Sequence, residues 1–454
     1  MLHQLIVFLF LTAMPFPVFA QNSDEDDALY SDGPDAVQSF EGVSGRPGGT
    51  RVIFSGSVDF RLVQTGASVS WKKGGRGLTR YGGIDTGNKE NQDGLGDQSS
   101  VAFKIPQITM TTDILFDEFF SGFIQFNYDD HYDSERKHGR IGVVEAYLGY
   151  DRGLENNSRV LSRLGLLIPP ISLEHPDPAW NTRYTITPSA INSWVGEELR
   201  VIAFEANYRI PFSAFHSLEL MLAPFSGNDP AGSILTWRGW ALHDYQLTAG
   251  SRLKAQSVVP EALVPKGEWV EPFKELDGRM GYYAKMGIRR AENWKMEMFY
   301  YDNMGDQVRT ELSTREYAWR TKFTNFSMEW FPFEKMTVMS QFLVGSTEMG
   351  NRLDPGVAAD LNAAYLLLSY SNSGHRISGR YDSFTVTEKD NLLTDPNDAE
   401  GTALTVAYLF DFDDAHRIGA EFLTVDSSRP GVEQFDENDD PDDDLFQLMY
   451  RMIF

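Results

Sequence analysis

Charged side chains in this sequence recur at intervals of two or four residues within stretches that are otherwise largely apolar, as in Asp59 and Arg61 or Arg376 and Arg380. Side chains two residues apart on a β-strand point to the same face of the sheet. A wall of such strands presents rows of cations, and charged rings that line a pore select ions by sign. The basic residues expected to line such a pore are Arg61, Lys104, Arg163, Arg209, Lys285, Arg289, Arg320, Lys322, Arg376, Arg380, Arg417 and Arg451.

Fewer acids are expected on the same face, so the wall should be net positive although the chain has a formal net charge of -25. These acids are Asp59, Glu145, Glu205, Glu219, Glu297, Asp360, Asp382 and Glu421. The remaining negative charge lies outside the expected strands, above all in residues 433–444, EQFDENDDPDDD. We expect this segment to be a solvated acidic run, and loose binding of divalent cations is the alternative.

Signatures of catalysis and of metal binding are missing from the sequence. It contains no His-Glu-x-x-His pair, no phosphate-binding Gly-x-x-x-x-Gly-Lys loop and no Gly-x-Ser-x-Gly elbow. The 8 histidines are scattered, and there is no cysteine. Residues 301–306 are rich in side-chain oxygens that could bind calcium, but we expect a turn at a strand end instead. We therefore expect no enzymatic activity, no metal and no cofactor.

The alternation that positions the charged residues runs along most of the chain, and the segments are joined by connections of two lengths. Short connections fall near residues 113–118, 151–158, 211–215, 290–293, 331–335, 371–375 and 411–415. Long polar connections fall near residues 65–100, 129–140, 169–198, 226–279, 302–315, 347–359, 387–400 and 426–444. Seven short and eight long connections join sixteen strands.

This sorting of connections predicts an all-β fold, a 16-stranded antiparallel transmembrane β-barrel with short periplasmic turns and long extracellular loops over residues 51–454. Only a closed sheet leaves no unpaired backbone groups in hydrocarbon. The last strand fits, because Phe446, Leu448, Tyr450, Met452 and Phe454 share one face that would meet lipid. A strand ending in phenylalanine resembles the carboxyl-terminal signal read by the barrel-insertion machinery.

Two further segments precede the barrel. Residues 1–20 have an apolar centre and small residues at Val18 and Ala20, which predicts a signal peptide cleaved after Ala20 and hence export to the outer membrane of a Gram-negative bacterium. Residues 21–50 are acidic and rich in Gly, Ser and Pro, which predicts a disordered leader.

The third long connection, residues 169–199, is rich in Pro, Asn, Ser and Trp and is long enough to fold back into a barrel. A constriction formed there would be mixed or acidic. Its candidate residues are Glu174, His175, Asp177, Arg183, Glu197, Glu198 and, at its exit, Arg200.

Several stretches resemble the phosphate-selective porin O and P family of outer-membrane porins. They are residues 168–174 (IPPISLE), 182–194 (TRYTITPSAINSW), 341–350 (QFLVGSTEMG), 375–384 (HRISGRYDSF) and 416–430 (HRIGAEFLTVDSSRP). The resemblance implies a sixteen-stranded porin that forms a homotrimer and carries its third loop in the lumen. It also implies arginines at the constriction, for which Arg183 and Arg200 are the residues carried over.

We therefore expect a porin that allows passive diffusion of small hydrophilic solutes or ions, with a preference for anions such as phosphate. Its partners would be outer-membrane lipid, the insertion machinery and other copies of the chain, and no nucleic acid. One alternative is a non-conducting barrel that acts as an adhesin or as a structural or cation-binding surface protein. Another is a soluble exported β-rich binding protein or hydrolase.

Overall fold

The computed structural model describes residues 49–73, 75–84, 99–129, 140–255, 269–291, 293–350, 356–392, 395–429 and 443–454. The predicted signal peptide, all but the last two residues of the predicted leader, and residues 433–442 of the acidic segment lie outside these ranges. Within the described residues, no helix is long and apolar enough to cross a membrane.

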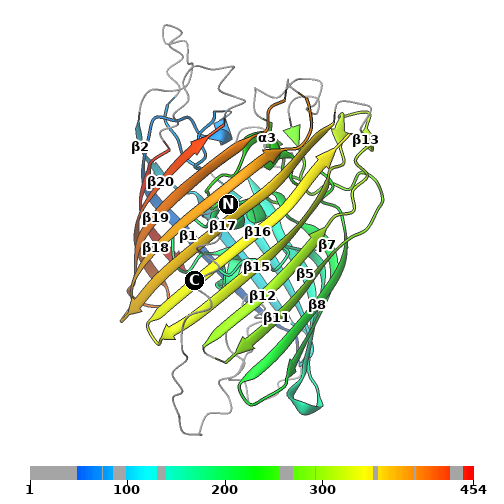
Figure 1. Ribbon diagram of the computed structural model, residues 1–454. Helices are drawn as coiled ribbons and strands as arrows, with labels where there is room; N and C mark the ends of the chain where they lie inside the picture. The colour runs from blue at the N-terminus through cyan, green and yellow to red at the C-terminus, as the bar shows by residue number, and fades with distance from the viewer. Residues whose placement is uncertain are drawn as a thin grey trace, which may run out of the picture.

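The wall of the molecule is one closed antiparallel barrel (Figure 1). Its strands are β1 (Arg51–Thr65), β2 (Ser100–Lys104), β3 (Gln107–Leu115), β4 (Phe120–Asp129), β5 (Ile141–Gly153), β6 (Arg159–Leu167), β7 (Val201–Pro211), β8 (His216–Ser226), β11 (Gly281–Arg290), β12 (Trp294–Asp302), β15 (Arg320–Phe333), β16 (Met336–Met349), β17 (Val357–Asn372), β18 (His375–Glu388), β19 (Ala399–Asp411), β20 (His416–Ser428) and β21 (Leu445–Ile453). Both β2 and β3 pair with β1, and Pro106, which lacks a backbone N–H, lies between them. They therefore form one interrupted strand, and the predicted 16-stranded barrel is confirmed.

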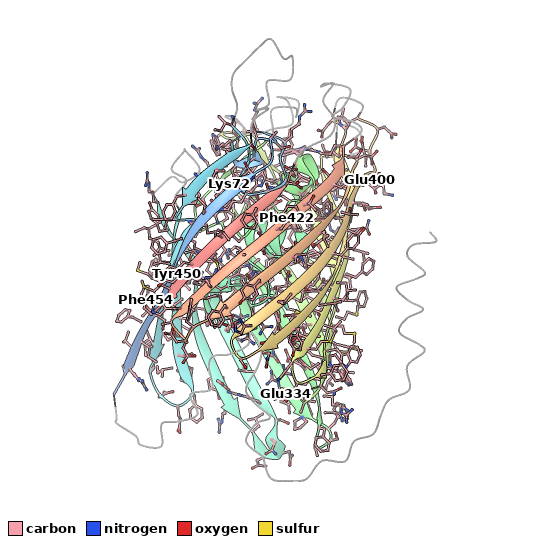
Figure 2. All side chains as sticks on the ribbon, turned by 90° about the vertical axis from the view of Figure 1, so that its left-hand side faces the viewer. Lys72, Glu334, Glu400, Phe422, Tyr450 and Phe454 are labelled. Carbon is pink, nitrogen blue, oxygen red and sulfur yellow. The ribbon has the colours of Figure 1, made fainter. Side chains whose placement is uncertain are left out.

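Short helices and strands lie in the long loops. They are η2 (Trp71–Lys73), η4 (Pro178–Trp180), α2 (Ala190–Glu198), α3 (Ser233–Arg238), β9 (Leu253–Lys254), β10 (Trp269–Val270), β13 (Thr310–Glu311) and β14 (Glu316–Tyr317), while η3 (Glu155–Asn157) lies in a short turn. Figure 2 shows Glu334, in the short turn between β15 and β16, at one end of the barrel, and Lys72 and Glu400 at the opposite end. We call these the short-turn end and the long-loop end.

The first and last strands close the barrel. The register of β1 with β21 runs from Ser57 opposite Ile453 to Thr65 opposite Leu445. Beyond it, Gly56 N donates to Phe454 O at 2.8 Å and Phe454 N donates to Gly56 O at 3.0 Å. A Cβ atom on Gly56 would lie 2.6 Å from the backbone oxygen of Thr109 on β3 and 2.7 Å from the Phe454 ring, so this position requires glycine. Phe422, Tyr450 and Phe454 lie on the outer surface, as the predicted lipid face requires (Figure 2).

The apolar face of the wall changes sides along the long strands β15 to β20. In β17, Leu366 and Leu368 point outward and are exposed, which suits contact with lipid. Toward the long-loop end of the same strand, Leu361 points inward and is fully buried, while Asp360 and Asn362 point outward. Along β15 to β20 the outer surface is therefore apolar toward the short turns and polar toward the long loops.

This change of face overturns three predictions. Arg320, Lys322 and Asp360 were expected on the inner wall, but they lie on the outer face, because Thr321 and Phe323 occupy the inward positions of β15 and the odd-numbered residues of β17 point inward. On the long-loop part of these strands the apolar residues pack inside the barrel, so the apolar face there is not the face that meets lipid.

The long-loop half of the barrel interior contains a packed core of side chains. One buried apolar cluster joins inward wall residues such as Phe225 and Phe323 to loop residues such as Trp194 and Trp240. The Trp194 ring lies 5.3 Å from the ring of Phe323 and 5.8 Å from that of Trp240. The lumen of a sixteen-stranded barrel was expected to be aqueous; in this conformation its long-loop half has a packed core.

Candidate functional site

The third long loop, residues 168–200 (L3), folds into the barrel and includes α2. Every residue of α2 is buried, and the Ser189 side chain caps its first turn by accepting from Asn192 N. On the wall strand β16, Gln341 donates to Ile171 O at 3.0 Å and accepts from Asn192 Nδ2 at 2.9 Å. The loop is therefore held against the inner face of the wall, the position that the family resemblance implied.

Arg380 of β18 holds the centre of L3. Its Nη1 lies 3.0 Å from Glu174 Oε1 of the loop, and its Nε lies 2.7 Å from Asp382 Oδ2 of its own strand. The same guanidinium donates to Thr187 O at 2.7 Å and to Pro188 O at 2.9 Å. The side chains of Arg380 and Glu174 are fully buried. Arg380 thus binds the loop and is not presented to solvent.

A second wall acid holds the next part of L3. Glu421 of β20 accepts from Ile186 N at 2.5 Å and from Thr187 N at 3.0 Å. Gln447 of β21 donates to Thr187 Oγ1 at 3.1 Å. These contacts come from β20 and β21, whereas L3 itself connects β6 to β7. L3 therefore joins the early strands of the wall to the last ones across the interior.

The fourth long loop, residues 227–280 (L4), also enters the barrel, which the sequence analysis did not predict. Glu198, at the end of α2, accepts from Gly232 N at 2.7 Å and Leu235 N at 2.8 Å, and so binds the first turn of α3. Glu197 forms two hydrogen bonds of 2.7 Å with the Arg238 guanidinium at the end of α3. Two adjacent glutamates that were expected at a constriction therefore join L3 to L4.

These two glutamates have opposite pKa shifts. Burial raises the pKa of Glu198 to about 8, and the neighbouring charge of Glu197 adds to the rise. Burial also acts to raise the pKa of Glu197, but Arg238 and then His243 outweigh it and lower that pKa to about 2. At neutral pH one of the pair is therefore charged and the other is largely protonated.

Two other candidate residues of L3, Arg200 and His175, are buried within the plug that L3 and L4 form. Burial lowers the pKa of Arg200 to about 10, and its guanidinium donates to Leu199 O at 2.9 Å and Leu247 O at 3.0 Å. Burial lowers the pKa of His175 to about 3, so the ring is neutral, and it stacks on Trp180 with centroids 4.2 Å apart. Neither residue lines an open path in this conformation.

A charged network attaches L4 and L1 (residues 66–99) to the seam strands. Arg61 lies 2.7 Å from Asp59 and 2.6 Å from Asp244 of L4, and Arg80 of L1 lies 3.0 Å from the same Asp244. Arg451 of β21 lies 2.6 Å from Asp59. The pore-lining candidates Arg61 and Arg451 are thus on the inward face and are neutralised by two aspartates.

Other basic candidates face the inside toward the short-turn end, where carboxylates balance them. The expected excess of positive charge is therefore largely offset along these strands. The pairs are Arg163 with Glu205 (2.8 Å), Arg209 with Glu219 (3.4 Å), Lys285 with Glu219 (2.8 Å) and Glu297 (3.4 Å), and Arg417 with Asp411 (2.5 Å).

Lys104, Arg289 and Arg376 are the remaining basic candidates for the pore lining, and all three are on the inward face. Lys104 lies opposite Arg61 in the strand register, and Arg289 lies opposite Lys295. Arg376 donates to Ser369 Oγ at 3.0 Å, and its guanidinium lies 4.9 Å from the centre of the Tyr184 ring of L3.

The loop candidates Asp177 and Arg183 form an ion pair of 2.7 Å with side chains 26% and 35% exposed, unlike the buried candidates of L3. This pair lies on the part of L3 nearest to Arg376, because Tyr184 follows Arg183 directly. The short-turn side of L3 therefore presents charge to the interior.

One group of carboxylates in the described residues has the spacing of a metal site. The oxygens of Asp229, Glu275 and Asp277 lie within 4.8 Å of one another. They accept backbone hydrogen bonds, Asp229 from Leu276 N at 2.5 Å and Glu275 from Gly227 N at 2.8 Å, and so close the base of L4. This structural role accounts for the group without an ion.

Comparison with known proteins gives a likeness of fold. No protein-family model matches the chain, and no curated protein matches it. Among solved structures, the outer membrane channel DcaP of Acinetobacter baumannii is similar, with a TM-score of 0.52, 10% identity and coverage of 90% of this chain and 99% of that one. The fold is that of an outer-membrane barrel.

Two further structures are similar at lower scores. The anion-selective porin from Comamonas acidovorans has a TM-score of 0.46 and 10% identity, over 89% of this chain and 100% of that one. Loop-deleted OmpT, an outer membrane protein of Vibrio cholerae, has a TM-score of 0.49 and 9% identity, over 89% and 99%.

Proposed function

We propose that the chain is a porin-type channel in the outer membrane of a Gram-negative bacterium, with the short turns in the periplasm, and that it passes small hydrophilic solutes past the L3 and L4 plug. The observation that carries this proposal is a closed barrel whose inner wall binds its filling loops through polar and ionic contacts. The interior of outer-membrane barrels is polar, and in porins it is a water-filled channel.

The route of the solute is proposed along one side of the interior. On β3 and β4 the inward residues Thr109, Gln125 and Asn127 are neutral and polar. Gln125 Nε2 and Asn127 Nδ2 donate to Gln246 Oε1 of L4 at 3.1 and 3.0 Å. Neutral hydrogen bonds hold less strongly than charge-assisted ones. L4 should therefore separate from β3 and β4 more readily than from Arg61 of β1, which holds Asp244 of L4 at 2.6 Å, and more readily than L3 separates from Arg380.

The proposed preference for anions rests on the short-turn side of L3. Among the described residues, Arg376 has no carboxylate within ion-pair distance, and the charges of Arg183, Arg417 and Asp411 act on it. Arg183 and Arg417 are themselves paired with Asp177 and Asp411, so Arg376 supplies the net positive charge that would favour a negative ion there. The anion class fits phosphate, chloride and organic acids alike.

Planar-bilayer recording of the purified full chain tests both parts of the proposal. We expect current steps and, under a potassium chloride gradient, a reversal potential of the sign given by anion selectivity. Arg376→Ser should move that potential toward zero. Arg290→Ser is the matched control, because Arg290 points outward and is exposed at the short-turn end of β11, and it should leave the potential unchanged.

Failure of the experiment has two distinct forms. A cation-selective current would refute the anion preference but would agree with the proposal that the chain is a channel. A reconstituted, folded barrel without current would refute the channel and favour the non-conducting surface barrel, which the buried apolar core between the loops and wall also supports.

Two partners belong to the same proposal. The barrel-insertion machinery would read β21, whose outward residues end at the 59% exposed Phe454. The channel would assemble as a homotrimer, as the family resemblance implies. Light scattering of the detergent-solubilised chain measures the second, and a monomer would refute it.

A further inference from the structure

The side-chain amide of Gln246, in L4, is enclosed by four hydrogen-bonding groups of the wall and of L3. Its Oε1 accepts from Gln125 Nε2 at 3.1 Å and from Asn127 Nδ2 at 3.0 Å. Its Nε2 donates to Ala179 O at 3.3 Å and to Trp180 O at 3.2 Å. We call these four groups the amide cradle. A primary amide has two acceptor positions on its oxygen and two N–H donors, so the cradle satisfies all of them.

The cradle has donors on one side and acceptors on the other. Backbone carbonyls only accept hydrogen bonds, so the nitrogen of the Gln246 amide faces L3 and its oxygen faces the two amide nitrogens of β4. The side chains of Gln125, Asn127 and Gln246 are buried. A buried site built to hydrogen-bond a particular group rejects an analogue that lacks the group, because its own polar atoms are then left unpaired. The arrangement therefore selects a carboxamide over a carboxylate or an apolar group.

The acceptor side of the cradle is built from strained backbone. Ala179 and Trp180 have φ of 64° and 56°, in the left-handed region that residues other than glycine rarely adopt. This conformation brings two successive carbonyl oxygens within 3.3 Å of one nitrogen. Such strain persists where the surroundings enforce it, and it concentrates at active sites and ligand clamps. The strained pair of residues thus points to a binding function for the cradle.

The cradle is neutral, unlike the region around Arg376. The charged side chains nearest to it in sequence are paired, Asp244 with Arg61 at 2.6 Å and Asp177 with Arg183 at 2.7 Å. Among the described residues, Gln125 Oε1 has no hydrogen-bond partner although it is buried. The cradle therefore has acceptor capacity that Gln246 does not use.

We propose that the amide cradle is a binding site for solutes that carry a primary carboxamide, and that Gln246 occupies it in this conformation in place of such a solute. The role in transport rests on the proposed function, because the cradle lies on the proposed route along β3 and β4. A solute carboxamide replaces the Gln246 amide group for group, so the cradle keeps its hydrogen bonds after the exchange. Displacement of Gln246 releases this part of L4 from β4, so the solute shifts the population toward the open route.

Calorimetric titration of the purified full chain in detergent tests the site with three amino acids whose side chains are similar in size: glutamine, glutamate and methionine. We expect glutamine to bind at least about ten-fold more tightly than the other two, because neither of their side chains can donate to Ala179 O and Trp180 O.

Two variants should change the affinity for glutamine in opposite directions. Gln246→Ala removes the internal occupant and should strengthen binding, by about ten-fold if Gln246 fills the cradle for about nine-tenths of the time. Gln125→Leu removes a donor and should weaken binding about two- to ten-fold, the range for one neutral hydrogen bond. Gln64→Leu is the matched control, because Gln64 points outward and is exposed on β1, and it should have no effect. A purely structural role of these contacts would not produce opposite shifts.

Heat-modifiable gel mobility verifies that each variant is folded. Equal binding of glutamine and methionine, by the unaltered chain and by folded Gln246→Ala, would overturn the inference. If Gln246→Ala does not fold, the unaltered chain, Gln125→Leu and Gln64→Leu decide by the same comparison. Calorimetry does not require conduction, so a chain that binds glutamine selectively but carries no current would refute the proposed channel alone. A chain that conducts without selective binding would overturn this inference alone.

Discussion

Arg380 offers the sharpest test of how the plug is held. We predict that Arg380→Met releases L3 from the wall while the barrel stays folded. The substitution removes the hydrogen bonds to Glu174, Asp382, Thr187 and Pro188, and it leaves two buried carboxylates without their cation. The backbone pairing of β18 with β17 and β19 is untouched.

Removing one partner of a buried ion pair costs about 3–5 kcal/mol. If this cost falls on the docking of L3, the ratio of docked to released loop decreases by a factor of roughly 10² to 10⁴. Single-channel recording should then show larger or more frequent open states. Arg380→Met with Glu174→Gln should be milder than Arg380→Met alone, because it removes one of the two stranded charges.

Arg159→Met provides the control. Arg159 of β6 also forms an ion pair, with Asp151 of β5 at 2.5 Å, but each side chain is 19% exposed and the pair lies at the short-turn end of the β5–β6 hairpin. Equal conductance for the unaltered chain, Arg380→Met and Arg159→Met would refute the view that the Arg380 ion pair holds the plug closed.

Three more predictions concern the pH dependence of the plug, the stability of the closing seam and the orientation of side chains on β15. The pKa of Glu198 is about 8 in the plug and near 4.5 in the unfolded chain. Its contribution to the stability of the plug is therefore complete below pH 4.5 and is lost as pH rises through about 8. The open probability of the channel should increase from pH 6 to 9, and Glu198→Gln should abolish the increase. Gly56→Val should destabilise the wall at β1 by about 1–3 kcal/mol through its clash with the backbone oxygen of Thr109 and with the Phe454 ring, so less heat-modifiable folded barrel should form on a gel. Since the chain has no cysteine, Lys322→Cys should react with a maleimide in the folded protein and the buried Thr321→Cys should not; reversed reactivity would restore the original face prediction.

The wall was predictable from the sequence because it follows from two regularities, alternation and the lengths of connections. The face assignments held where the outside of a strand meets lipid, as for Arg61 and Arg451. They failed at Arg320 and Lys322. Alternation shows that one face of a strand is apolar, but it does not show whether that face contacts lipid outside the barrel or packs in a core inside it.

The filling of the barrel was harder to predict. L3 was identified from its composition, but the partners of its charges were not, because Arg380 and Glu174 are 206 positions apart in sequence. L4 was taken for an external loop. The apolar run at residues 234–237, Ile-Leu-Thr-Trp, was the available signal, since a solvated loop has no need of it.

The position of L3 in the chain restricts how the barrel can assemble. L3 lies between β6 and β7, yet the side chains that hold it, Arg380, Glu421 and Gln447, come from β18, β20 and β21. Those strands are synthesised last, and β21 then joins β1. L3 can therefore bind in its final position only after β18, β20 and β21 have joined the wall, so the filling of the barrel is completed no earlier than its last strands.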